Sequence, residues 1–166
     1  FEGGLDLNMS SNIEEMKPRE IDQFLACARV GRLGVSLEDG SPYIVPVGYV
    51  YVDGKIFFHA CDKGLKMASI RRNSNVCFEV DEALSDISMF KSVIIFGTVE
   101  IINKKEMIAY LQRLIDKYRV PVSFDEYVSR PGLNREQLIR DVRVCAITPK
   151  KITGRRMARK NSHFLV

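Results

Sequence analysis

The most constraining feature of this 166-residue sequence is the pair Asp53-Gly54, which lies between two strand-like apolar segments, residues 43–52 and 55–60. Asp-Gly readily supplies the positive φ angles of a two-residue hairpin turn, so the pattern predicts two antiparallel strands. Pro46 stands inside the first strand and cannot donate a backbone hydrogen bond. Its position, with Gly48 on the same face, predicts either an open edge that can accept a flat ring or a strained barrel corner.

The second strand runs directly into Asp62-Lys63-Gly64, after which the apolar period changes to that of a helix. A helix that begins there directs free backbone N–H groups and a partial positive charge towards the end of the strand. Lys63 and Lys66 add two full positive charges. The combination indicates a phosphate site. The alternative is an ordinary strand-to-helix connection whose lysines are solvated.

The rest of the chain predicts a mainly β fold of the α+β class. Strands joined by hairpins, rather than alternating with helices, favour a six-stranded antiparallel barrel with peripheral helices over a doubly wound sheet. Residues 81–89 are expected to be a loop or a short helical turn, residues 120–133 a long loop, and Pro149 is expected to end the last strand. The predicted strands are 30–37, 43–52, 55–60, 76–80, 90–102 and 142–148. The predicted helices are 64–72, 104–118, 134–140 and a short one that starts at Pro18 and ends before Gly31.

Composition fits one globular domain, since 46% of the residues are hydrophobic and charges of both signs are mixed. We expect a flexible segment or cloning remnant over residues 1–12, the barrel domain over 13–157 and a basic tail over 158–166. The basic residues from Lys150 onwards are interpreted as a solvated tail or a dimer contact rather than a nucleic-acid site. No apolar run is long enough to cross a bilayer, and no secretion signal is recognisable.

The four cysteines are widely spaced, which argues against zinc and fits reduced thiols in a cytoplasmic protein. Cys77 and Cys145 fall in apolar strand patterns and are predicted to lie in the core. Cys61 lies at the predicted phosphate site, where it is either a reactive thiol or simply a small residue at a strand end. No metal site is predicted.

The order of elements and several motifs resemble the FMN-binding split-barrel superfamily related to pyridoxamine 5′-phosphate oxidase, with the nitroimidazole-resistance type nearest. The resemblance spans roughly residues 21–156. The matching motifs are ARVGRLG (28–34), DGSPYIVPV (39–47), DGKIFFHA (53–60), GLK (64–66), IRRN (70–73), VCFEV (76–80), SVIIFGTV (92–99) and ITG (152–154).

This resemblance implies a split barrel that forms a homodimer, with FMN held between the two subunits. It further implies that Val45, Pro46 and Val47 lie along the flavin ring, with Phe58 and His59 beside the ring and ribityl chain. Lys66 would hold the phosphate, with Lys63 as a second contact, and Ser92 would reach the flavin from another strand. The resemblance also places His59 at the active site, where it either transfers protons or only packs against the cofactor.

The expected function is that of an FMN-dependent oxidoreductase that reduces a small organic substrate, such as a nitro compound or quinone, with electrons from a nicotinamide or a partner reductase. The C-terminal motif with which true pyridoxamine-phosphate oxidases hold their substrate is absent from residues 150–166, so that reaction is not expected. Two alternatives remain open. One is a split barrel that binds haem or a deazaflavin, and the other is a flavin-binding sensor without catalysis.

Overall fold

A computed structural model describes residues 13–83, 89–118 and 120–157. The segments 1–12 and 158–166, expected to be a flexible start and a basic tail, lie outside the described residues. The elements, in order, are β1 (Ile13–Glu15), α1 (Pro18–Cys27), β2 (Val30–Ser36), β3 (Pro42–Val52), β4 (Lys55–Cys61), α2 (Leu65–Arg72), β5 (Asn75–Ala83), β6 (Phe90–Ile101), α3 (Lys104–Lys117), α4 (Phe124–Val128), α5 (Arg135–Asp141) and β7 (Val142–Met157).

Strands β2 to β7 form a closed antiparallel barrel, in agreement with the predicted fold. The strand order is β1-β7-β4-β3-β2-β5-β6, and pairing of β6 with β7 closes the circle. The short β1 adds to the end of β7. The hairpin between β3 and β4 turns at Asp53 and Gly54, whose φ angles are 49° and 76°, which confirms the turn predicted from this pair.

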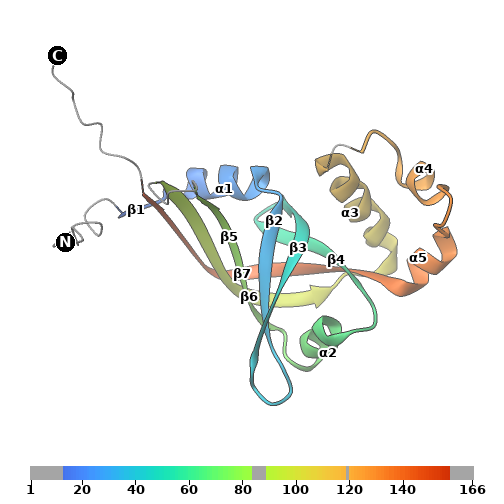
Figure 1. Ribbon diagram of the computed structural model, residues 1–166, viewed down its shortest axis with the longest axis horizontal. Helices are drawn as coiled ribbons and strands as arrows, with labels where there is room; N and C mark the ends of the chain where they lie inside the picture. Colours follow the sequence, from blue (N-terminus) through green and yellow to red (C-terminus); the bar gives the residue numbers. More distant parts are fainter. Residues whose placement is uncertain (1–12, 84–88, 119, 158–166) are drawn as a thin grey trace, which may run out of the picture.

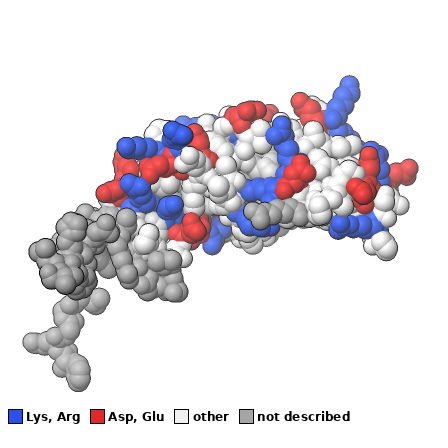
Figure 2. Space-filling view, turned by 90° about the horizontal axis from the view of Figure 1, so that it is seen from above, with Lys and Arg blue, Asp and Glu red and all other residues white. Residues whose placement is uncertain are grey.

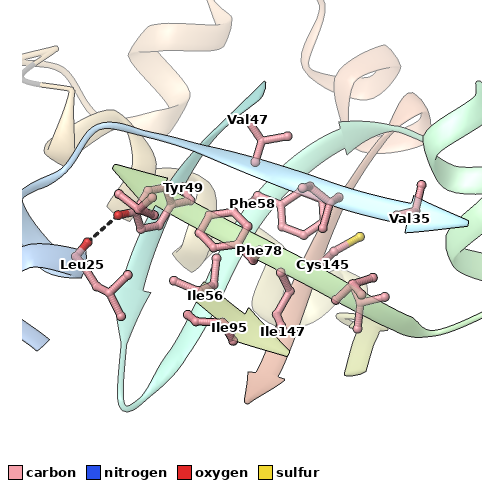
Figure 3. Close-up of a cluster of buried hydrophobic side chains, with 14 of the residues drawn as sticks. Leu25, Val35, Val47, Tyr49, Ile56, Phe58, Phe78, Ile95, Cys145 and Ile147 are labelled. Carbon is pink, nitrogen blue, oxygen red and sulfur yellow. Dashed lines mark hydrogen bonds between the residues drawn. The ribbon is translucent and has the colours of Figure 1, made fainter. Parts of the chain in front are cut away.

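The barrel encloses an apolar core, shown in Figure 3. Tyr49 lies on the α1 side of this core, fully buried, and donates a 2.7 Å hydrogen bond from its hydroxyl to the carbonyl oxygen of Leu25 on α1. Its ring meets Phe78 edge to face, with the centroids 5.1 Å apart. Gly31 is required where β2 passes the Phe78 ring, because a Cβ atom at this position would lie 2.1 Å from that ring.

A second apolar cluster lies outside the barrel, between the outer surfaces of β3, β4 and β7 and the helices α3, α4 and α5. Phe57 of β4 stacks on Tyr110 of α3 at 3.9 Å between centroids. Figure 1 shows these three helices gathered at one end of the molecule, while α1 lies between β1 and β2, away from them. The three helices α3, α4 and α5, which we call the helical lobe, therefore cover the outer surface of β4 up to its end at Cys61.

Three of the predicted boundaries are wrong. β5 continues through Ala83, α4 forms within the region expected to be a loop, and β7 continues past Pro149 to Met157. Pro149 is tolerated because the ladder with β6 changes register there: Gly97 pairs with Pro149, whereas Phe96 pairs with Lys151. Residues 150–157 are therefore strand rather than tail, and Arg156 forms ion pairs with Glu14 and Glu20.

The cysteine predictions are half right. Cys145 is buried inside the barrel, whereas Cys77 is only half-buried, because its neighbours Val76 and Phe78 occupy the inner face of β5. On the surface shown in Figure 2, basic and acidic side chains alternate without forming a field of one sign. None of the helices in the described segments is both long and apolar enough to span a membrane.

Candidate functional site

The barrel is split between β3 and β4. These two strands pair only from Tyr49–Phe58 to Val52–Lys55. Beyond that point β3 continues to pair with β2 on one side, whereas β4 pairs with β7 as far as Cys61. In the described residues, the stretch of β3 from Pro42 to Gly48 therefore has no strand along its other edge. Pro46 lies within this open edge, which is one of the two arrangements predicted for it.

The side chains of this edge alternate between inside and outside. Val45 and Val47 face the barrel core, and Pro46 is exposed on the outer surface. A ligand lying along this edge would therefore meet backbone groups and the Pro46 ring rather than the two valine side chains. Backbone N–H and C=O groups at a free strand edge are ready hydrogen-bonding partners for a flat polar ring.

Helix α2 begins beside the end of β4, as expected. Gly64 is its N-terminal cap with a φ of 121°, a conformation that favours glycine, and its carbonyl accepts a 3.0 Å hydrogen bond from the N–H of Ala68. The side chain of Asp62 pairs with Arg71 and, at 2.9 Å, with Arg143. This pairing holds the strand end against the start of the helix and the start of β7.

Two lysines at this turn remain without a carboxylate. Within the described residues, neither Lys63 nor Lys66 forms an ion pair or a side-chain hydrogen bond, in contrast with the two arginines on Asp62. Lys63 is exposed. Lys66 is half-buried, with its Nζ 5.8 Å from the Phe58 ring centroid, and burial lowers the pKa of Lys66. Positive charge is thus concentrated here, and the free-energy cost of partly burying the Lys66 ammonium group would be offset by an anionic ligand.

His59 lies on the outer surface of β4, opposite Val144 of β7. Part of the imidazole is accessible, but the surrounding protein displaces water and lowers the pKa of His59 below its usual 6.5, and the charge of Lys66 lowers it further. At neutral pH the side chain is therefore uncharged. It can accept a proton or hydrogen-bond a ligand, and it lies within electrostatic reach of the lysine expected to hold a phosphate.

Two of the residues expected in the site are placed elsewhere. The Phe58 side chain is fully buried in the barrel core, since it alternates with His59 along β4, and its ring faces the core rather than the outer surface that carries His59. Ser92 is on the outer surface of β6, where its hydroxyl is 3.5 Å from Glu79. Three strand spacings of about 4.8 Å separate it from Pro46 along the order β3-β2-β5-β6. Within one chain Ser92 does not join the lysines.

Two cavities flank the end of β4. One, of about 430 Å³, is polar and lies between the Asp62-Lys63 turn and the residues Arg140, Asp141 and Arg143. The other, of about 410 Å³, is mainly apolar and lies between β4 and the helical lobe. Cys61 lines both. The helical residues of the second cavity were not foreseen as site residues, because an amphipathic helix such as α3 looks the same in sequence whether it covers a core or a cavity.

Tyr118 was also not foreseen. It follows α3 and accepts a 3.1 Å hydrogen bond from the backbone N–H of Tyr49, while its own hydroxyl donates to the carbonyl of Arg29. Gly48 makes room for this contact, since a Cβ atom there would lie 2.6 Å from the Tyr118 oxygen. Tyr118 therefore caps the point where β3 and β4 separate. Nothing in the sequence pattern linked these residues.

A six-stranded antiparallel barrel that opens between two neighbouring strands is a split barrel. Lys63 and Lys66, which have no carboxylate partner among the described residues, lie just past the end of β4 and suit an anion. The chain belongs to the pyridoxamine 5′-phosphate oxidase family, whose model matches residues 17–156. This confirms the superfamily resemblance. Comparison with curated protein sequences gives no match.

Several solved structures share the fold. One is a proposed 5-nitroimidazole antibiotic resistance protein from Bacteroides thetaiotaomicron, with a TM-score of 0.68, 19% identity and coverage of 87% of this chain and 88% of that chain. An FAD-binding protein from Mesorhizobium loti has a TM-score of 0.63, 23% identity and coverage of 88% and 99%. An FAD- and haem-binding protein from Mycobacterium smegmatis has a TM-score of 0.70, 15% identity and coverage of 89% and 74%.

Proposed function

We propose that this protein is an FMN-binding flavoprotein that acts as a homodimer and reduces a small organic substrate, such as a nitro compound or quinone, with electrons from a nicotinamide or partner reductase. The observation that carries the proposal is the half-buried Lys66, unpaired within the described residues, in the first turn of α2 just past the end of β4, the strand that separates from the open edge of β3. Flavin binding by two solved proteins of the same fold supports it.

The residues present fit FMN in two respects. A phosphate against Lys66 and Lys63 would compensate the two charges that lack a carboxylate, and charge-assisted hydrogen bonds of this kind are the strong ones. The free backbone C=O and N–H groups of the open edge of β3, with Pro46 contributing only its C=O, can hydrogen-bond to the polar rim of a flavin ring. Pro46 adds an apolar contact on the outer surface, where it is exposed.

When bound, FMN supplies the redox chemistry, and the protein contributes binding, orientation and electrostatics. In this assignment Lys66 and Lys63 hold the phosphate, and the backbone of β3 orients the ring. His59 is uncharged at neutral pH in the free protein. A phosphate beside Lys66 would offset the lysine charge that lowers the pKa of His59, so the imidazole would hold a proton more readily once the site is filled.

The proposed homodimer uses the outer surface of β2, β3, β5 and β6. Ile44, Gly34, Cys77 and Phe96 form one row across these strands by their pairing. Ile44 is 66% exposed and Phe96 is 49% exposed, which leaves apolar surface along the row with no cover in a single chain. A second copy packed on this surface would also lie beside the open edge of β3 and near Ser92.

The phosphate assignment is tested by titrating the flavin-free protein with FMN, and with riboflavin, which lacks the phosphate. Lys66→Ala should weaken FMN binding by roughly 1.5–3 kcal/mol, about 10- to 150-fold, because one charge-assisted contact is lost. Riboflavin affinity should change less than threefold. Lys104→Ala, which removes an exposed lysine at the start of α3, is the matched control and should bind FMN like the parent.

The cofactor itself is identified by mass spectrometry of the chromophore released from purified protein. FMN is the expected result, and haem or a deazaflavin would replace the assignment. Steady-state oxidation of NADH or NADPH in the presence of a quinone or nitro compound separates an enzyme from a sensor. If the protein binds flavin but shows no turnover, it is a flavin-binding protein and the reductase assignment is wrong.

A further inference from the structure

The apolar cavity between β4 and the helical lobe is of a size that suits a small ligand. Its volume of about 410 Å³ lies within the range of roughly 300–1,000 Å³ typical of ligand pockets. Its floor is the outer surface of β4, at His59 and Cys61. Its walls come from α3 and α4, among them Leu111, Ile115 and Phe124.

The residues that line this cavity disfavour a charged ligand. Lys, Arg, Asp and Glu are absent from the described residues that line the cavity. Its polar groups are the His59 imidazole, the Cys61 thiol and the hydroxyls of Tyr118 and Tyr127, and the Tyr118 hydroxyl is already engaged with Tyr49 and Arg29. A charged ligand would leave water without a compensating partner, whereas an apolar ring with one or two hydrogen-bond acceptors would find suitable contacts.

His59 connects this cavity with the positively charged turn. The imidazole lines the cavity, and the positive charge of Lys66 acts on it electrostatically. Cys61, two residues further along β4, lines both this cavity and the polar cavity at Lys63. A molecule inside the apolar cavity would therefore lie next to the place assigned to the cofactor, with a hydrogen-bonding imidazole in its wall.

We propose that this cavity binds an uncharged ring compound of the size of a naphthoquinone, with His59 as a hydrogen-bonding contact. Its role as the electron-accepting substrate rests on the proposed function, whereas the binding itself does not. In the overall reaction a quinone, one NAD(P)H and one proton give a hydroquinone and NAD(P)⁺. The reduced nicotinamide is the electron donor already proposed, so electrons and protons balance.

The binding test uses 2,3-dimethyl-1,4-naphthoquinone, whose methyl groups block addition of the Cys61 thiol to the ring, and 2-naphthoate as a charged comparator. Leu133, 42% exposed at the cavity, and Ile13, equally exposed on β1 and outside the cavity, provide a matched pair. Equilibrium dialysis should show at least tenfold weaker quinone binding for Leu133→Trp and unchanged binding for Ile13→Trp. Naphthoate should bind the parent at least tenfold more weakly than the quinone.

The location test uses fluorescence, since the chain contains no tryptophan. Tyr127→Trp places one indole in the cavity wall, and quenching by the quinone should saturate with the same dissociation constant as dialysis gives. Quenching of Ile13→Trp should rise linearly with concentration. Naphthoate binding equal to that of the quinone, unchanged quinone binding in Leu133→Trp, or linear quenching in Tyr127→Trp would each overturn the proposal.

Parallel FMN titration of the same proteins keeps the two proposals separable. Leu133→Trp should bind FMN normally, and Lys66→Ala should bind the quinone normally. If the protein binds the quinone but not FMN, the proposed function is wrong and the cavity is still a ring-binding site. FMN binding with no saturable quinone binding would remove this inference and leave the proposed function intact.

Discussion

The Nζ atom of Lys117 lies 3.9 Å from the centroid of the Tyr49 ring, at the point where α3 ends against the barrel. The Nζ atom is buried, and it has no hydrogen-bond partner among the described residues. A cation over an aromatic face is attracted by the ring, but loss of water favours the uncharged amine. Burial accordingly lowers the pKa of Lys117 to about 8, and the charge of Arg29 contributes in the same direction.

Lys117→Met should stabilise the protein by about 1 kcal/mol, because an unsatisfied buried donor is removed at the cost of one cation–π contact. Urea unfolding at pH 7 measures the change. Lys104→Met, which alters an exposed lysine on the same helix, is the control and should change stability by less than about 0.5 kcal/mol. A loss of stability in Lys117→Met would mean that the ring contact outweighs the cost of burial.

The same lysine makes stability depend on pH. Its pKa is lower in the folded chain than the usual 10.5, so between about pH 8 and 10.5 the unfolded chain holds more protons. Stability therefore rises with pH across this window. The gap between Lys117→Met and the parent should be widest at pH 7 and should narrow as the pH is raised to 9.5. A constant gap would show that the buried amine does not titrate there.

His59 is expected to lower stability on mild acidification. Its pKa in the folded chain lies below the usual 6.5, so as the pH falls through 6.5 the unfolded chain binds the proton first, and the folded state loses stability. Thermal unfolding between pH 7.5 and 5.5 should show a smaller decrease in His59→Gln than in the parent. Equal decreases would assign the effect to other groups.

Binding of FMN should raise the pKa of His59, since a phosphate offsets the nearby charge of Lys66. Proton NMR of the imidazole resonances, with and without FMN, measures this shift. The chain has only two histidines, so His163→Gln assigns the remaining signal. In Lys66→Ala the pKa of His59 in the free protein should already be higher. An unshifted signal would place the phosphate away from Lys66.

The sequence was most informative where a local pattern determines the backbone. Asp53-Gly54 specified the hairpin because few other pairs adopt two positive φ angles. Pro46, which lacks an N–H, predicted an open edge or a barrel corner, and the structure shows the open edge. The helix predicted over 134–140 forms as α5, where the Asn134 side chain accepts a hydrogen bond from the backbone N–H of Gln137. These features depend on residues close together in sequence, so they can be read before the fold is known.

The sequence was less informative where distant segments decide the outcome. Pro149 ends a strand by local rules, yet β7 continues because a register change opposite Gly97 absorbs it. The helix α4 has only five residues, and its Ser123–Glu126 capping box lies in a segment with two prolines and little apolar period, which is typical of a loop. The contact between Tyr49 and Lys117, and the cavity walls, depend on how α3 docks on the barrel, which no local pattern encodes.

Tyr118→Phe should reduce the free energy of unfolding by about 1–3 kcal/mol, because the backbone N–H of Tyr49 loses its acceptor at a half-buried position. Gly48→Ala should have a comparable effect, since the added methyl group would lie 2.6 Å from the Tyr118 oxygen. The double variant tests the contact, because phenylalanine removes the atom that the methyl group meets. Its loss should be smaller than the sum of the two single losses, and strict additivity would contradict the clash.

Ile44→Glu should convert the proposed dimer to a monomer. Ile44 is highly exposed and aligned through Gly34 and Cys77 with Phe96, so a carboxylate there would be buried without a partner when two copies pack on this surface. Sedimentation velocity at micromolar concentration should show dimer for the parent and for Ile13→Glu, the control on β1, and monomer for Ile44→Glu. FMN affinity should fall in Ile44→Glu as the dimer dissociates, because the second copy would complete the site at the open edge of β3. A parent that sediments as a monomer while binding FMN tightly would show that one chain suffices, and the apolar row would then need another explanation.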